Sequence, residues 1–513
     1  MGNLMRRARS RPSVLLIISL VCSVVALGEP VERNLPDLGD RSSGIISPEL
    51  EREIGQDFLR QLRRSVPYVS DPLLQDYVEH LTFRLAANSE LSDKRLDLII
   101  LAGTDINAFA APGGIVGINL GLFLHGQNEH EFAAIVAHEL AHLSQRHFAR
   151  QIENAEQPAL INAAGLLAGI VLSATTGLDA GLAAVTTGQA LALDHMLRHS
   201  RAREREADRL GISTLVRSGH DPAAMAAMFE RLDRSHRFSG DNVPEFLRTH
   251  PVTGARIADS LNQVTRLPRK SFAPSLDYHL MRNRVRVRAS TESPSDLVRI
   301  FTDDINRYRR PSFSGHQTVL ADAAQYGLSL ALQKENRPVQ ALRQIRSLRD
   351  RYPVKISLLL AEADVLIQLQ DSTRAIDLLR SGLTLSPGNY PISMNLALLL
   401  SREGFAADAT DLLSPLTGER PNDIYLWYEL AEIHGLADNT IAIHEARAEY
   451  FVLAGNPQQA IRQLKFALPL VVDNFQRRER IRKRILDIEA RVERSVQANG
   501  LGEHQSTLSD HPH

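Results

Sequence analysis

Cysteine is almost absent from this chain of 513 residues, which contains only Cys22. A single cysteine excludes an intrachain disulfide framework and the cysteine-rich classes of zinc site. The fold must therefore be stabilised by packing, and any tightly held metal must be bound by His, Glu or Asp. The length is sufficient for two or three domains.

The chain also lacks an excess of either charge and has few long apolar runs. Its 59 Lys and Arg balance 60 Asp and Glu, so nucleic acid is not an expected partner. Four arginines, at positions 6, 7, 9 and 11, precede the apolar run 14–27 and the small-x-small pattern Ala26-Leu27-Gly28. A run of 14 residues is shorter than the ~20 of a spanning helix. We therefore predict a cleaved signal peptide over 1–28, export to a bacterial envelope compartment and a linker over 29–48.

A second uncharged run covers residues 159–178 and is long enough to cross a membrane. It contains Asn162, Ser173, two threonines and three glycines, so its hydropathy is modest. A buried or membrane-touching helical hairpin is therefore favoured over a span, with peripheral membrane contact through 159–193.

Two patterns indicate the fold. Helical periodicity over 48–87 precedes two β-rich segments, 96–101 and 115–120, which are separated by Pro112-Gly113-Gly114. From Thr318 onward, prolines recur every 34 residues, and an alanine and a bulky residue recur with them: Pro353, Pro387 and Pro421; Ala341, Ala375 and Ala409; Ile345, Leu379 and Leu413. This interval predicts a tetratricopeptide solenoid over 311–495, after a connecting segment at 266–310 and before a disordered tail at 496–513.

The stretch "VAHELAHLSQRH", residues 136–147, contains His-Glu-x-x-His within an apolar helical pattern. Residues four apart project from one helix face, so His138 and His142 can bind one ion. Glu139 is rotated by one position and can reach a water on that ion. A catalytic zinc site takes three protein ligands, so a further ligand must come from elsewhere.

The segment "SRAREREADRLG" supplies candidates for the third ligand. Glu204 shares a small, apolar helix face with Asp208, whereas Glu206 lies on a mostly solvated face. We therefore predict Glu204 as the ligand, Asp208 as the acceptor that orients a ligating histidine, and Glu206 as a surface residue. His147 is treated as a surface residue or an outer neighbour of the ligands. The histidines at 130, 195, 199 and 220 have no spacing that indicates a ligand.

The pairing of His138-Glu139-x-x-His142 with Glu204-x-x-Ala207-Asp208 resembles the zinc metalloprotease family that includes the membrane heat-shock protease HtpX and the CAAX prenyl endopeptidases. "NAFAAPGG" (107–114) and "THPVTGARI" (249–257) are similar to two further elements of that family, so the resemblance covers residues 49–265. It implies a zincin-type α+β domain in a mostly α protein with a small β-sheet, and one Zn²⁺ per chain. It also implies that His250 approaches the zinc as a fourth ligand or gate.

The signal peptide and the solenoid narrow the resemblance to periplasmic members of the family that act in outer-membrane β-barrel assembly. This implies an endopeptidase that removes misfolded or stalled barrel proteins, with a chaperone-like solenoid and the barrel assembly machinery as partner. Glu139 would be the general base and acid, and the strand at 115–119 would pair with extended substrate. Two alternatives are a zinc-containing chaperone or adaptor with a blocked site, and a membrane-integral prenyl protease.

Overall fold

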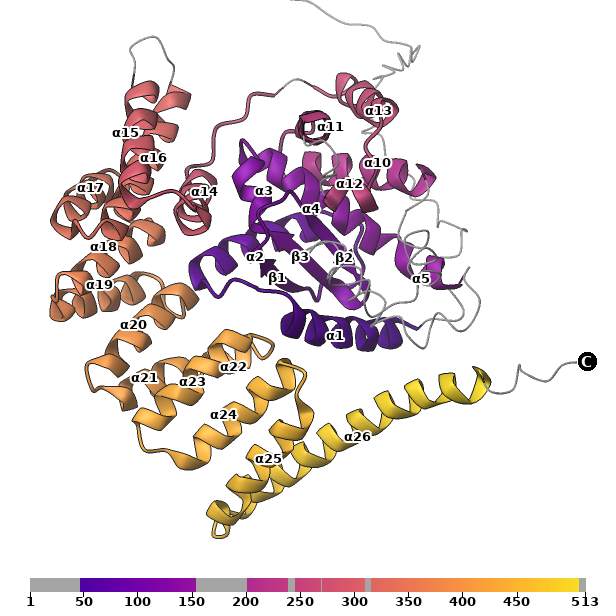
Figure 1. The fold of residues 1–513 in the computed structure, drawn as a ribbon, viewed down its shortest axis with the longest axis vertical. Coiled ribbons are helices and arrows are strands. Elements are labelled where there is room, and N and C mark those ends of the chain that lie inside the picture. Colours follow the sequence, from indigo (N-terminus) through magenta and orange to yellow (C-terminus); the bar gives the residue numbers. More distant parts are fainter. Residues whose placement is uncertain (1–46, 154–200, 239–244, 269, 310–314, 507–513) are drawn as a thin grey trace, which may run out of the picture. The chain divides into compact units, whose positions relative to one another are not determined.

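The computed structural model describes residues 47–153, 201–238, 245–268, 270–309 and 315–506 (Figure 1). The predicted signal peptide and the uncharged run 159–178 lie outside the described residues, as do His195 and His199. Within the described ranges, no helix combines the length and apolar character needed to cross a membrane.

Two capped helices begin the first domain. Helix α1 (Pro48–Ser65) and helix α2 (Pro72–Ala87) each have proline in the first turn, where its missing N–H costs nothing. The side chains of Ser47 and Asp71 accept hydrogen bonds from the backbone N–H groups of Leu50 and Leu74. These caps fix both helix starts and confirm the helical pattern predicted for 48–87.

A three-stranded sheet follows, in the order β1 (Asp97–Leu101), β3 (Ile115–Asn119), β2 (Ala108–Ala111). Strand β3 is parallel to β1 and antiparallel to β2, and all five of its residues are buried. The short turn η1 (Pro112–Gly114) joins β2 to β3, with Gly113 and Gly114 at positive φ. The two predicted strands are confirmed, whereas β2 was not predicted.

The sheet order corrects the predicted docking strand. Segment 115–119 was expected to pair with substrate, but β1 and β2 already take both of its edges. Strand β2 is an edge strand, so any added strand on this side of the sheet would pair with β2.

Seven further helices complete the first domain in the part of the chain that the structure describes. They are α3 (Leu120–His125), α4 (Glu129–Ser144), α5 (His147–Glu153), α10 (Arg201–Arg217), α11 (Ala224–Phe238), α12 (Glu245–Thr249) and α13 (Gly254–Thr265). Helix α4 carries the His-Glu-x-x-His motif and packs against β2, α2, α10 and α11 (Figure 1). Asn128 caps its start by accepting from the Glu131 N–H, and its apolar residues join the main core. The motif is therefore held on a buried, well-anchored helix.

The second half of the chain is a series of antiparallel helix pairs. Its helices are α16 (Gly315–Lys334), α17 (Pro338–Arg351), α18 (Ile356–Gln368), α19 (Ser372–Leu385), α20 (Tyr390–Arg402), α21 (Ala406–Leu413), α22 (Leu416–Glu419), α23 (Ile424–Leu436), α24 (Thr440–Leu453) and α25 (Pro457–Ala467). The repeating alanines, Ala341, Ala375 and Ala409, are all fully buried where successive helices meet. The predicted solenoid and the mostly helical fold class are confirmed.

The borders of the helical array differ from the predicted boundaries. The segment expected to be a connector contains α14 (Leu276–Ala289) and α15 (Pro294–Tyr308), which both pack against α16. The turn η3 (Leu468–Val471) precedes α26 (Phe475–Ser506), which runs into the region expected to be a disordered tail. The array of packed helices is thus longer than the part of the sequence in which the 34-residue repeat is visible.

Polar contacts join the array to the first domain. Arg420 donates to both carboxylate oxygens of Glu79 at 2.7 Å, and the Asn422 amide donates to Asp97 on β1 at 2.8 Å. Arg63 on α1 donates to the Leu453 carbonyl at 3.1 Å. The array is therefore tied to the edge of the sheet opposite β2.

Candidate metal centre

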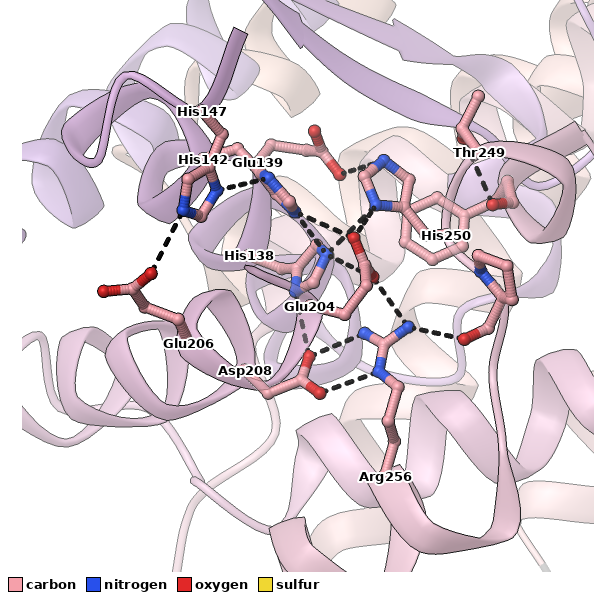
Figure 2. A network of polar contacts seen from close by, with 12 residues as sticks. His138, Glu139, His142, His147, Glu204, Glu206, Asp208, Thr249, His250 and Arg256 are labelled. Atoms are coloured by element: carbon pink, nitrogen blue, oxygen red, sulfur yellow. Dashed lines mark hydrogen bonds and ion pairs between the residues drawn. The ribbon is translucent and has the colours of Figure 1, made fainter. Parts of the chain in front are cut away.

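Four buried side chains from three parts of the first domain converge at one point (Figure 2). His138 and His142 lie one turn apart on α4, Glu204 lies on α10, and His250 directly follows α12. Each offers one ligand atom, and these four atoms all lie within 4.8 Å of one another. The burial of the four residues excludes a chance cluster of solvated surface groups.

The spacing of the four ligand atoms suits a tetrahedral ion. His138 Nε2 lies 3.1 Å from His142 Nε2 and 3.4 Å from His250 Nδ1. Glu204 Oε1 lies 3.4 Å from His142 Nε2 and 3.0 Å from His250 Nδ1. Tetrahedral ligands at about 2.0–2.1 Å from Zn²⁺ are about 3.3 Å apart, so these four distances are close to those of a tetrahedral zinc site.

Asp208 and Arg256 support this cluster on the side of His138 that faces away from the ligand atoms. The Asp208 carboxylate lies 3.0 Å from His138 Nδ1, the ring nitrogen that points away from the cluster. Arg256 on α13 donates twice to Asp208, at 2.8 and 2.7 Å, and lies 2.7 Å from Glu204 Oε2. One buried cation thus holds two buried acids in fixed positions.

The acids and histidines change one another's proton affinity. Burial lowers the pKa of His138, but the carboxylates of Asp208 and Glu204 outweigh it and raise the pKa to about 9. Burial raises the pKa of Glu204, but His250, His138 and His142 together hold it well below its usual range. Hydrogen bonds from Arg256 and His138 likewise outweigh burial and lower the pKa of Asp208. The two acids therefore stay ionised, as a ligand and its supporting carboxylate must be.

Glu139 has a different environment. It is 1% exposed, and its Oε1 accepts no hydrogen bond from any residue that the structure describes. The Nε2 atom of His250 lies 3.6 Å from this oxygen. Burial raises the pKa of Glu139, opposed in part by His250, His138 and a hydrogen bond from the Ala110 backbone. A carboxylate with spare acceptor capacity and raised proton affinity is suited to accept a proton.

The hydrogen bond from Ala110 also places the sheet edge beside the cluster. Ala110 belongs to β2, which packs against α4. In the part of the chain that the structure describes, the edge strand β2 thus lies next to Glu139.

The structure brings together all six side chains that the sequence singled out: His138, Glu139, His142, Glu204, Asp208 and His250. Their roles in metal binding and catalysis stay predictions. Two secondary expectations can also be compared with the structure. Of the two alternatives for His147, the surface position is wrong and the outer neighbour fits, because its ring is fully buried and its Nδ1 lies 2.9 Å from His142 Nδ1. Glu206 is partly exposed, at 34%, and its Oε2 lies 3.2 Å from His147 Nε2.

Arg256 is the important residue that the sequence reasoning did not assign. It lies in the quoted segment "THPVTGARI", six positions after His250, on α13. It is 4% exposed and its guanidinium lies over the Phe229 ring at 4.6 Å. Buried acids need a cation nearby. The two acids predicted to be buried, Glu204 and Asp208, were therefore a signal for a buried arginine such as Arg256.

Comparison with known proteins identifies the chain. The model for peptidase family M48 matches residues 72–263. The chain is 31% identical over 436 residues to the β-barrel assembly-enhancing protease of Escherichia coli (strain K12), covering 84% of this chain and 86% of that protein. The chain belongs to peptidase family M48. It is therefore a metallopeptidase, and the family implies a metal ion.

Two further relatives show how far the similarity extends. The β-barrel assembly-enhancing protease of Yersinia pestis is 31% identical over 84% of this chain and 87% of that protein. The mitochondrial metalloendopeptidase OMA1 of Schizosaccharomyces pombe is 30% identical over 41% of this chain and 60% of that protein. Similarity to the bacterial proteins thus includes most of the helical array, whereas similarity to the mitochondrial one covers a shorter part.

Proposed function

We propose that this protein is a zinc endopeptidase of the bacterial envelope, exported by a signal peptide over residues 1–28. The observation that carries the proposal is the buried cluster of His138, His142, Glu204 and His250, with Glu139 beside it. Histidine and carboxylate ligands without sulfur, at tetrahedral spacing, favour zinc over a hard cation such as Mg²⁺ or Ca²⁺.

The residues of the cluster and around it have different roles in peptide hydrolysis. A zinc ion held by His138, His142 and Glu204 would supply a Lewis acid that lowers the pKa of a water toward ~7. Glu139 accepts the proton of the attacking water and passes it to the leaving amine, which its raised pKa favours. The Asp208 carboxylate, 3.0 Å from His138 Nδ1, would keep Nε2 aimed at the cluster.

His250 is proposed as a gate. Its Nδ1 is within 3.0–3.4 Å of Glu204 and His138, so it would compete with a water for the fourth place on an ion held there. Its backbone N–H donates to the Phe246 carbonyl at 2.8 Å, at the end of the five-residue helix α12. A ligand that follows so short a helix can be displaced more readily than one within α4 or α10.

The substrates are proposed to be unfolded outer-membrane β-barrel proteins that have misfolded or stalled. The names of the bacterial relatives support this class. An unfolded chain can lie along the free edge of β2, whereas a folded barrel has no extended segment to offer. The helical array would act in a chaperone-like way by presenting a surface to such chains and to the barrel assembly machinery.

The test compares cleavage of an unfolded outer-membrane barrel protein by the wild type, Glu139→Gln and His250→Ala, with zinc content measured for each. We expect Glu139→Gln to keep its zinc and to lose activity by roughly 10²–10⁴-fold, because only the proton carrier is removed. His250→Ala should cleave faster than the wild type.

The outcomes also separate the alternative function. Cleavage by Glu139→Gln at the wild-type rate would contradict the proposed role of this residue. If neither the wild type nor His250→Ala cleaves while both promote barrel assembly, the protein is instead a zinc-containing chaperone or adaptor with a blocked site.

A further inference from the structure

His147 lies beside His142, on the side away from the ligand cluster (Figure 2). Its Nδ1 lies 2.9 Å from His142 Nδ1, and its Nε2 lies 3.2 Å from Glu206 Oε2. The His147 ring is fully buried, whereas the Glu206 side chain is 34% exposed. Three side chains thus form a line that runs from the ligand cluster toward the surface.

The chemistry of a ligating histidine fixes the protons along this line. His142 Nε2 faces the other ligand atoms, so it needs its lone pair for the metal and its proton must be on Nδ1. That N–H can donate to His147 only if His147 Nδ1 carries no proton. The proton of a neutral His147 is then on Nε2, where it donates to the Glu206 carboxylate.

We infer that His147 and Glu206 are positioning residues that hold His142 in the orientation and tautomer required of a metal ligand. This rests on the proposed metal centre. The arrangement parallels the support of the other histidine, since Asp208 faces His138 Nδ1 directly at 3.0 Å. His142 has the same kind of carboxylate support, but with an imidazole between the ligand and the acid.

The backbone explains why His147 lies between His142 and Glu206. These three residues are called the relay below. Helix α4 ends at Ser144, and Arg146 follows with φ at 50°. This left-handed residue turns the chain, so that α5 begins with His147. The turn brings the His147 ring next to the His142 ring. Helix α10 supplies acids at three alternating positions: Glu204 faces the cluster, Asp208 faces His138, and Glu206 faces His147.

A histidine that merely filled the core would need no such pattern. Its two nitrogens would be satisfied by any nearby backbone group. Instead, one nitrogen faces a predicted ligand and the other faces a carboxylate on the helix that carries Glu204. The carboxylate–histidine pairing is the one that usually supports a metal-bound imidazole from outside the ligand set.

The experiment measures the zinc dissociation constant of the full-length protein by competition with a chelator, and the visible spectrum after cobalt(II) substitution. His147→Leu removes the acceptor while keeping a side chain of similar size. His147→Asn keeps an oxygen acceptor close to the position of Nδ1. We expect zinc affinity to fall by roughly 10–100-fold in His147→Leu, and by less in His147→Asn. The cobalt spectrum should shift in His147→Leu.

Two further variants make the test specific. His220→Leu is the matched control, because His220 is also buried (3% exposed) but lies in a different network, next to Ser218 and Arg84. It should leave zinc affinity unchanged. Glu206→Gln is at a half-exposed position and should fold even if His147→Leu does not; we expect it to weaken zinc binding by up to about 10-fold.

The results separate the relay from the metal centre itself. If the wild type binds zinc tightly and neither His147→Leu nor Glu206→Gln weakens it, the relay is wrong and the metal centre stands. An equal loss of affinity in His220→Leu would also overturn the relay. If the wild type binds no zinc, the proposed function fails and the relay fails with it.

Discussion

The buried acids of the helical array and those of the metal centre are neutralised in different ways. In the array, Glu362 accepts a hydrogen bond from Arg346 at 2.8 Å and another from Arg349. Asp322 pairs with Arg351 and accepts from the Tyr352 hydroxyl at 2.7 Å. Each of these acids therefore has its own partners from a neighbouring helix or turn.

The acids of the metal centre share their partners, which are one arginine and the histidines of the cluster. Glu139, Glu204 and Asp208 lie within one small volume, and Arg256 pairs with only two of them. The pKa of Glu139 is raised by burial, whereas hydrogen bonds from Arg346 and Arg349 outweigh burial and lower the pKa of Glu362. The comparison indicates that the charges of the array stabilise its own fold, whereas those of the centre form a buried group that could hold a metal ion.

The largest expected effect comes from removing the acid ligand. Glu204→Gln keeps the size of the side chain but removes the charge that faces three histidines. We expect zinc affinity to fall by more than the roughly 10–100-fold typical of a lost outer partner, and peptide cleavage to fall with it. Zinc titration of the purified variant checks this. Wild-type affinity would show that Glu204 is not a ligand.

A smaller effect is expected in the array and should leave the metal centre untouched. Asp322 is 1% exposed. In Arg351→Met it loses the arginine and keeps the hydrogen bond from the Tyr352 hydroxyl. We expect a loss of about 1–3 kcal/mol in the free energy of unfolding, and unchanged zinc affinity. Adding Asp322→Asn removes the unpaired charge and should recover part of the loss. If the double variant is no more stable than Arg351→Met, the array does not neutralise its acids pairwise.

The smallest effect is a pH dependence of the array. The pKa of Glu362 is below its ordinary value of 4.5 in the folded protein, so this acid stabilises the fold above about pH 4.5 and ceases to do so as pH falls through the folded pKa. Glu362→Gln should therefore be less stable than the wild type near neutral pH. The difference between the two should shrink between about pH 5 and pH 3 in denaturant unfolding curves. A difference that grows on acidification would mean that the sign of the pKa shift is wrong.

Much of the site could be predicted because its residues follow regular helix geometry. His138 and His142 share one face of α4, and the same argument chose Glu204 and Asp208 over Glu206 on α10. The 34-residue interval of small and bulky residues likewise predicted how the helices of the array meet, since the alanines are where the helices come closest.

The rest depends on features without a regular period. The helical spacing cannot be extended to His147, because the chain turns at Arg146 between α4 and α5. Strand β2 is four residues long, three of them alanine, so it lacks the β-branched pattern that marks a strand. The pairing of Arg256 with Asp208 spans 48 positions and depends on how α13 packs on α10. Such contacts follow from tertiary packing and not from local sequence.

The central claim is that the buried acids and histidines of the first domain enclose a metal ion, whereas the acids of the array do not. The most direct test is an anomalous difference map at the zinc edge, from crystals of the zinc-loaded protein. We expect one peak per chain, at about 2.0–2.2 Å from His138 Nε2, His142 Nε2 and a Glu204 oxygen. A zinc-loaded protein with no peak there, or with its peak among the acids of the array, would contradict the claim.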